Sequence, residues 1–223
     1  MSSRRAGIVI MLLLFTATIE RISSIQQWPI RPGARVRTID YDPAVPIVDR
    51  LLSEDDVVVI QRDRFPGITL NVDETLDAAL EHAMLHDTIV LAHGLVNSGT
   101  LIEQGTWIRG TVNGSISKII KAGHGIDSKA NRVTFWHQDG ELFIKNVHVR
   151  AGTYPVFDPS SSYLLLLGYD ESRGPYLGRA LKISTAGVLT TLMYSDGQTQ
   201  LPSRALYGHS AETVIAQLRK RAG

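Results

Sequence analysis

Apolar residues between positions 71 and 86 recur at intervals of three and four, which is the spacing of a helix with one buried face. The stripe consists of Leu76, Ala79, Leu80, Ala83 and Met84. Asn71 is a suitable N-cap with Glu74 as its capping-box partner, and Asp73 is an alternative cap. An uninterrupted apolar run at Thr88–Val96 follows directly and predicts a buried strand.

The rest of the chain has the pattern of short strands separated by turns. Trp107–Ile120 alternates loosely between apolar and polar residues, and Tyr163–Leu167 is apolar enough to predict a core strand. Two further strands are expected at Tyr176–Ser184 and Val188–Tyr194, before a final helix over residues 210–221. Frequent turn signals between short strands favour a small β-barrel or sandwich over alternating helices and parallel strands.

The clearest local signal is the pair Asp139-Gly140, which lies between two β-rich runs in the segment 132–149. Asp-Gly is favoured in two-residue type I′ turns, because both central residues need positive φ. If the residues of the two strands are paired outward from such a turn, Trp136 lies opposite Phe143. We therefore expect a central hairpin whose large apolar side chains stack across the ladder.

The N-terminus resembles an export segment. Two arginines precede an apolar run at residues 6–19, which is shorter than the roughly 20 residues that span a bilayer. This pattern predicts a signal peptide over residues 1–25. An uncleaved anchor and a buried helix of a cytosolic protein are the alternatives.

Prolines punctuate the segment 26–70, which argues against long helices there. We interpret this segment as a linker with one or two extra strands, at 35–41 and 57–60. Residues 71–223 then form the barrel domain.

Composition narrows the possible chemistry. At 223 residues and 43% apolar content, the chain is long enough to bury a core. The absence of cysteine excludes disulfides, thiolate metal sites and cysteine nucleophiles. A net charge of +1 argues against a dedicated nucleic-acid-binding protein, which usually has a basic domain.

The order of these segments resembles a loosely defined group of uncharacterised exported bacterial proteins, similar to OB-like barrels of the tissue-inhibitor-of-metalloproteinase kind. The segments that carry the resemblance are Leu76–Ala83, Thr88–Val96, Trp107–Ile120, Lys121–Gly123, Asp139–Gly140, Pro155–Phe157, Tyr163–Leu167, Gly178–Ser184 and Leu206–Leu218. The resemblance implies an OB-like barrel from about residue 71 to the C-terminus. It does not imply metalloproteinase inhibition, because inhibitors of that kind use an N-terminal cysteine.

Two motifs resemble parts of an α/β-hydrolase. Residues 89–94 end in a His-Gly turn, and residues 206–212 resemble a nucleophile elbow around Ser210. Glu212 stands where the elbow needs a second glycine, and no histidine follows Ser210 as that fold requires. We interpret Ser210 as the N-cap of the final helix.

His82 and His86 lie one helical turn apart and are candidate metal ligands. A third ligand would have to come from His93, His137 or His148, and the sequence does not fix which. Two histidines on the polar face near a helix end are the simpler interpretation.

A basic segment surrounds a glycine-bearing loop and has tryptophans beside it. Its candidate binding residues are Trp107, Lys121, His124, Lys129, Arg132 and Trp136. Such a set has the composition to bind an anion or single-stranded nucleic acid, as OB-fold loops and faces do.

We therefore expect a mainly β protein, a small antiparallel OB-like β-barrel with one helix before and one after the strands. The expected role is non-enzymatic: an exported protein that binds an unidentified protein or envelope component, without a cofactor. Membrane contact is expected only through an uncleaved N-terminal segment. A hydrolase or metal-dependent enzyme, and an OB-type binder of single-stranded nucleic acid, stay open as alternatives.

Overall fold

A computed structural model of the protein describes residues 32–62, 75–197, 199–200 and 205–223. The signal peptide expected over residues 1–25 lies outside these ranges, as do Asn71, Asp73 and Glu74. Within the described ranges, no helix is both long and apolar enough to span a membrane.

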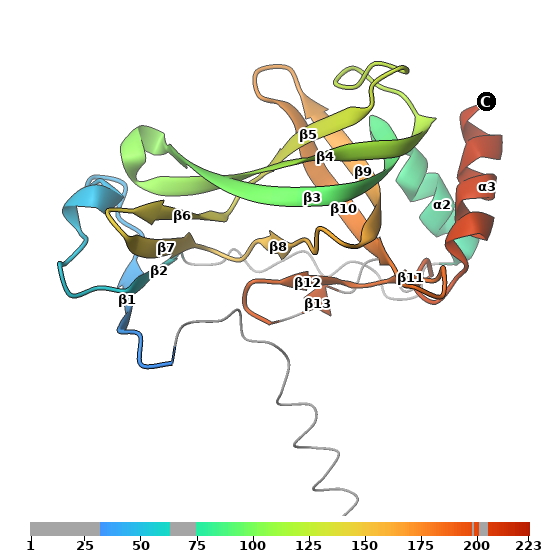
Figure 1. The fold of residues 1–223 in the computed structure, drawn as a ribbon. Helices are drawn as coiled ribbons and strands as arrows, with labels where there is room; N and C mark the ends of the chain where they lie inside the picture. The colour runs from blue at the N-terminus through green and yellow to red at the C-terminus, as the bar shows by residue number, and fades with distance from the viewer. Residues whose placement is uncertain (1–31, 63–74, 198, 201–204) are drawn as a thin grey trace, which may run out of the picture.

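Five strands form a closed barrel (Figure 1). They are β3 (Thr88–Ile102), β4 (Trp107–Lys121), β5 (Arg132–His137), β9 (Ser162–Asp170) and β10 (Gly174–Ile183). Neighbours around the barrel follow the order β3, β4, β5, β10, β9 and back to β3. Every contact is antiparallel except that between β5 and β10, which is parallel. Numbered along the chain, the barrel strands therefore run 1-2-3-5-4, the order of an OB barrel, and the predicted OB-like fold is confirmed.

Strand alternation separates the barrel interior from its outer wall. In β9, Tyr163, Leu165 and Leu167 belong to one buried cluster, which fills the barrel. Leu164 and Leu166 point the other way and belong to the cluster that carries the helices. Both sides of β9 are therefore buried, which accounts for its unbroken apolar sequence.

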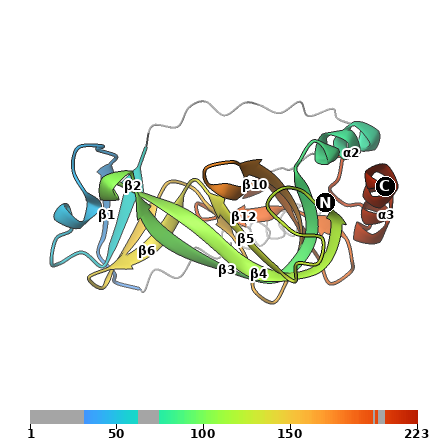
Figure 2. The ribbon, with the colours of Figure 1, turned by 90° about the horizontal axis from the view of Figure 1, so that it is seen from above.

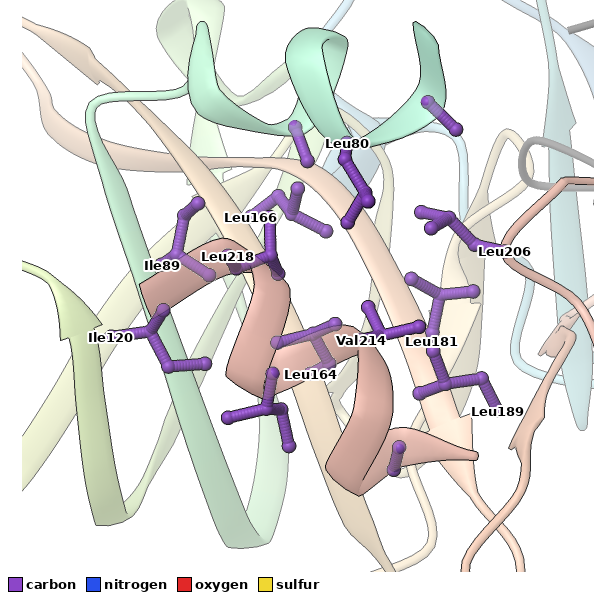
Figure 3. Packing of buried hydrophobic residues seen from close by; sticks show 14 residues of the cluster. Leu80, Ile89, Ile120, Leu164, Leu166, Leu181, Leu189, Leu206, Val214 and Leu218 are labelled. Atoms are coloured by element: carbon purple, nitrogen blue, oxygen red, sulfur yellow. The ribbon is translucent and has the colours of Figure 1, made fainter. Parts of the chain in front are cut away.

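Two helices pack together over the outer wall formed by β3, β9 and β10. They are α2 (Leu76–Met84), which precedes the barrel strands, and α3 (Ala211–Ala222), which follows them. Figure 3 shows Leu80 of α2 near Leu166 of β9, and Val214 of α3 near Leu164 of the same strand. Thr75 caps α2 by accepting a hydrogen bond from the backbone N–H of Ala78, and Ser210 caps α3 as predicted.

A second sheet lies at the opposite end of the molecule from the helices (Figure 2). Its strand order is β1 (Val36–Asp40), β2 (Val57–Gln61), β7 (Val147–Ala151) and β6 (Gly140–Ile144). The strands expected in the segment 26–70 are β1 and β2, and they pair in parallel. Trp107, at the start of β4, is buried in the apolar cluster of this sheet, so the long strands β3 and β4 join the two sheets.

Short elements complete the described chain. They are the 3-10 turns η1 (Ile47–Asp49) and η2 (Glu103–Gly105) and the strands β8 (Pro155–Val156), β11 (Leu189–Thr190), β12 (Leu192–Tyr194) and β13 (Thr199–Gln200). Strand β11 extends the barrel sheet from β10, whereas β8, β12 and β13 form a small third sheet.

The predicted hairpin at Asp139-Gly140 is wrong. Strand β5 pairs with β4 and β10 in the barrel, whereas β6 pairs with β7 in the second sheet. The two-residue turn with positive φ is at Lys145 (φ 49°) and Asn146 (φ 69°), and it joins β6 to β7. Phe143 consequently pairs with His148 of β7 instead of Trp136, and it is 70% exposed.

Asp139 and Gly140 instead lie where the chain passes from β5 of the barrel to β6 of the second sheet. The Asp139 carboxylate accepts a hydrogen bond from the backbone N–H of Thr153 (3.0 Å). A Cβ at position 140 would lie 2.8 Å from the backbone nitrogen of Gly110. Glycine is therefore needed here for close backbone approach.

Replacement of Gly140 by valine should destabilise the fold by about 1–3 kcal/mol, because the added side chain forces the backbones of β4 and β6 apart. Urea unfolding followed by circular dichroism measures this. Phe143→Ala is the matched control, and it should change the free energy of unfolding by about 1 kcal/mol or less, since the ring is mostly exposed. Equal stability of Gly140→Val and wild type would contradict the close contact.

Candidate ligand-binding site on the barrel

The outer face of β4 and β5 carries polar and aromatic side chains in register. Thr111 lies opposite Trp136, and Asn113 lies opposite Thr134. The Thr134 hydroxyl donates a hydrogen bond to the Asn113 side-chain oxygen (2.8 Å). The intervening residues of both strands point into the barrel, so this face is left to solvent.

A hollow of about 430 Å³ lies on this face. Its lining includes Arg109, Thr111, Arg132, Thr134, Trp136 and Arg173. Part of the wall comes from the loop at 125–130 and part from the turn between β9 and β10. Three barrel strands and two connections therefore contribute to one surface.

Trp136 is the centre of this hollow. The guanidinium carbon of Arg109 lies 5.8 Å from its ring centroid, and that of Arg173 lies 5.7 Å away. The Tyr176 ring lies beside it at 5.5 Å, tilted by 43°. These distances place cationic and aromatic groups around one indole, as in cation–π contacts.

The charge of the lining is positive. It carries three guanidinium groups, those of Arg109, Arg132 and Arg173, against the single carboxylate of Asp127. None of the three arginines forms an ion pair with a carboxylate of the described ranges. Arg109 Nε and Trp136 Nε1 are buried donors with no hydrogen-bond partner among these residues. The hollow therefore offers positive charge that no carboxylate of the described residues pairs with.

The structure brings together only two of the six candidate binding residues. Arg132 and Trp136 line the hollow. Trp107 is 1% exposed and donates from Nε1 to the Gln138 carbonyl (3.2 Å) in the interior. Lys129 is exposed on the neighbouring loop but is not part of the lining.

Lys121 and His124 have structural contacts of their own. The Lys121 ammonium donates to the carbonyls of Met84 (2.8 Å) and His86 (2.6 Å), where α2 ends. His124 pairs with Asp87 at 2.6 Å through Nδ1. These two side chains tie the loop at 122–131 to the end of the helix.

Arg109, Arg173 and Tyr176 were missed from the sequence. Arg109 shares the strand face of Thr111, so correct alternation along β4 would have found it. Arg173 and Tyr176 come beside Trp136 only through the parallel contact of β5 with β10, for which the sequence shows no local signal.

The candidate metal ligands do not converge on a common point. His82 is exposed, whereas His86 is partly buried and its Nδ1 lies 3.3 Å from the Ala83 carbonyl. Burial lowers the pKa of the His86 imidazole. In the part of the chain that the structure describes, no three His, Asp or Glu side chains are grouped to hold a metal ion.

His137 lies at the inner face of β5, below this surface. It is 7% exposed, and its Nε2 lies 3.2 Å from the side-chain oxygen of Asn97. A Cβ at Gly110 would overlap its ring at 1.9 Å, so the imidazole packs directly on the β4 backbone. Burial lowers the pKa of His137 to about 4, and the ring is neutral at pH 7.

Comparison of the sequence with known proteins does not assign this protein to a family. No protein-family model matches the sequence, and no curated protein matches it. The function of the protein is therefore inferred from the geometry and charge of the candidate site.

The buried His137 should make stability depend on pH. Its pKa is about 4 in the folded protein and about 6.5 in the unfolded chain, so the unfolded state binds more protons between these values. The free energy of unfolding should fall by about 3 kcal/mol from this group as the pH drops from 7 to 4.

Unfolding of wild type and His137→Gln across this pH range measures the difference. The stability gap between the two proteins should be largest at pH 7 and should shrink toward pH 4. His93→Gln, which removes an exposed histidine, is the control. Parallel pH profiles for wild type and His137→Gln would contradict the burial of a neutral ring.

Proposed function

We propose that the protein is a non-enzymatic binding module whose β4–β5 face binds single-stranded nucleic acid. The observation that carries this proposal is Trp136, flanked by the guanidinium groups of Arg109 and Arg173 on an exposed barrel face.

The position of the site supports the proposal. OB folds bind oligonucleotides and oligosaccharides on the face of their second and third strands, together with the loops after the first and fourth. Here β4 and β5 are the second and third barrel strands. Arg173 lies in the turn after the fourth, β9.

The chemistry supports nucleic acid over other anions. Single-stranded nucleic acids are held by aromatic side chains that stack on bases and by cations that contact the phosphates. Trp136 and Tyr176 supply the aromatic surface, and the three arginines supply the charge. The overall charge of +1 argues against an extended basic surface, but the lining of this hollow itself carries three arginines against one carboxylate.

The site is short. Arg132 and Trp136 are four positions apart on β5, which corresponds to about 13 Å of strand. We therefore expect a site near the lower limit of the roughly 4–16 nucleotides that single OB folds bind.

An unidentified protein or an envelope component was the partner expected from the sequence, and export through residues 1–25 stays a prediction. An anionic envelope polymer without bases would engage the arginines but gain little from Trp136. Comparison of ligands with and without bases therefore separates the two partners.

Fluorescence anisotropy with a labelled dT oligonucleotide tests the proposal. Trp136→Ala should weaken binding by about 5- to 150-fold, which corresponds to 1–3 kcal/mol of base stacking. Arg109→Gln and Arg173→Gln should each reduce the slope of log affinity against log salt by about 0.7. Arg35→Gln removes an exposed arginine at the second sheet and should leave binding unchanged.

Two results would overturn the proposal. One is the absence of oligonucleotide binding by the folded wild-type protein. The other is equal affinity for the oligonucleotide and for polyphosphate of the same charge, together with no effect of Trp136→Ala. That second result would indicate an anion site that does not recognise bases.

A further inference from the structure

A second hollow, of about 200 Å³, lies where β3 separates from the barrel. The pairing of β3 with β9 ends at His93, and Gly94 follows with φ 63°. Beyond this bend, β3 runs past the short strand β8, and the Asn97 side chain donates a hydrogen bond to the Pro155 carbonyl (2.9 Å). The hollow lies between these two segments.

Its walls are apolar, with one charged group. Leu95, Val156 and Phe157 are among the apolar lining residues. Glu141, from β6, is the only lining residue whose side chain carries a charge. This is the opposite sign from the arginine-lined hollow on β4 and β5.

Hydrogen bonds from neighbouring side chains reach only one of the two oxygens of the Glu141 carboxylate. Oε2 accepts hydrogen bonds from the Tyr154 hydroxyl (2.5 Å) and from His148 Nε2 (2.8 Å). Oε1 accepts none from the described residues. Arg150 Nε lies 3.8 Å from Oε2 and donates to the Tyr154 hydroxyl, but Arg150 does not line the hollow.

The carboxylate is ionised at neutral pH. Burial alone would raise the pKa of Glu141, but the hydrogen bonds from His148 and Tyr154 outweigh burial and lower it. The ionised Glu141 carboxylate, with Oε1 free to accept a hydrogen bond, thus lies beside the apolar residues of the hollow. Donors that carry a positive charge make the strongest hydrogen bonds to such an oxygen.

We propose that this hollow binds a small primary amine, with the ammonium at Glu141 Oε1 and an apolar stem against Val156 and Phe157. The volume is below the usual range of about 300–1,000 Å³ for small-molecule sites, so the ligand is small. Carboxylates of the same shape should bind less tightly, because Glu141 is the one charged side chain of the lining, although Arg150, 3.8 Å from its Oε2, offsets part of that charge. The site does not depend on the nucleic-acid face, because the two hollows share no lining residue.

Calorimetric titration with phenethylamine and phenylacetate tests this proposal. The two probes share an aromatic stem and differ in the sign of the charged end. Phenethylamine should bind saturably in the millimolar range or below, and at least about tenfold more tightly than phenylacetate.

Variants locate the binding. Glu141→Gln should weaken phenethylamine binding by about tenfold or more, because it removes the charge and keeps the shape. Val156→Phe fills the hollow without touching the hydrogen-bond network and should abolish binding. Glu103→Gln is the matched control, because that carboxylate also accepts a hydrogen bond from a tyrosine, Tyr41, outside the hollow. Glu103→Gln should bind the amine as wild type does, and the dT oligonucleotide should not displace the amine.

Several results would overturn the proposal. They are equal binding of phenylacetate, wild-type amine affinity in folded Val156→Phe, and the absence of saturable amine binding by wild type. If Glu141→Gln does not fold, Val156→Phe decides the question. Displacement of the amine by the dT oligonucleotide would instead move the ligand to the barrel face and refute a separate site.

Discussion

The close backbone approach at Gly110 is the constraint on which the two-sheet arrangement depends. The His137 ring covers this glycine on one side, and Gly140 contacts its backbone on the other. The Gly110 amide also donates to the Asp139 carbonyl at 3.2 Å. A side chain at this position would separate β4 from the segment in which the chain leaves β5 for β6. Because β4 belongs to the barrel and also packs through Trp107 into the apolar cluster of the second sheet, this contact holds the barrel and the second sheet together.

The elements with continuous or strictly periodic apolar patterns were predictable from the sequence. The stripe around Leu80 and the run at Tyr163–Leu167 became a helix and a core strand, because burial alone explains both patterns. The Asp139-Gly140 signal failed because a glycine after an aspartate also suits close backbone packing. The turn at Lys145 and Asn146 lacks glycine, so local preference gave no sign of it.

The candidate site was predictable only where its residues are close in sequence. Arg132 and Trp136 belong to one strand, so alternation places them on one face. Arg173 and Tyr176 follow some 40 residues later and reach Trp136 through a parallel strand contact. Trp107 and Lys121 looked equivalent in the sequence, but the interior and the end of α2 occupy them. Composition identifies basic and aromatic residues, whereas topology decides which of them share a surface.

The pairing of β5 with β10 consists of the single residue pair Tyr176 and Trp136, so it is the shortest strand pairing of the barrel. Those two residues also form the aromatic part of the candidate site. A ligand that contacts both strands binds only the closed form, and mass action therefore stabilises closure as the ligand concentration rises. Occupancy of the proposed site and closure of the barrel are then thermodynamically linked through this one strand pairing.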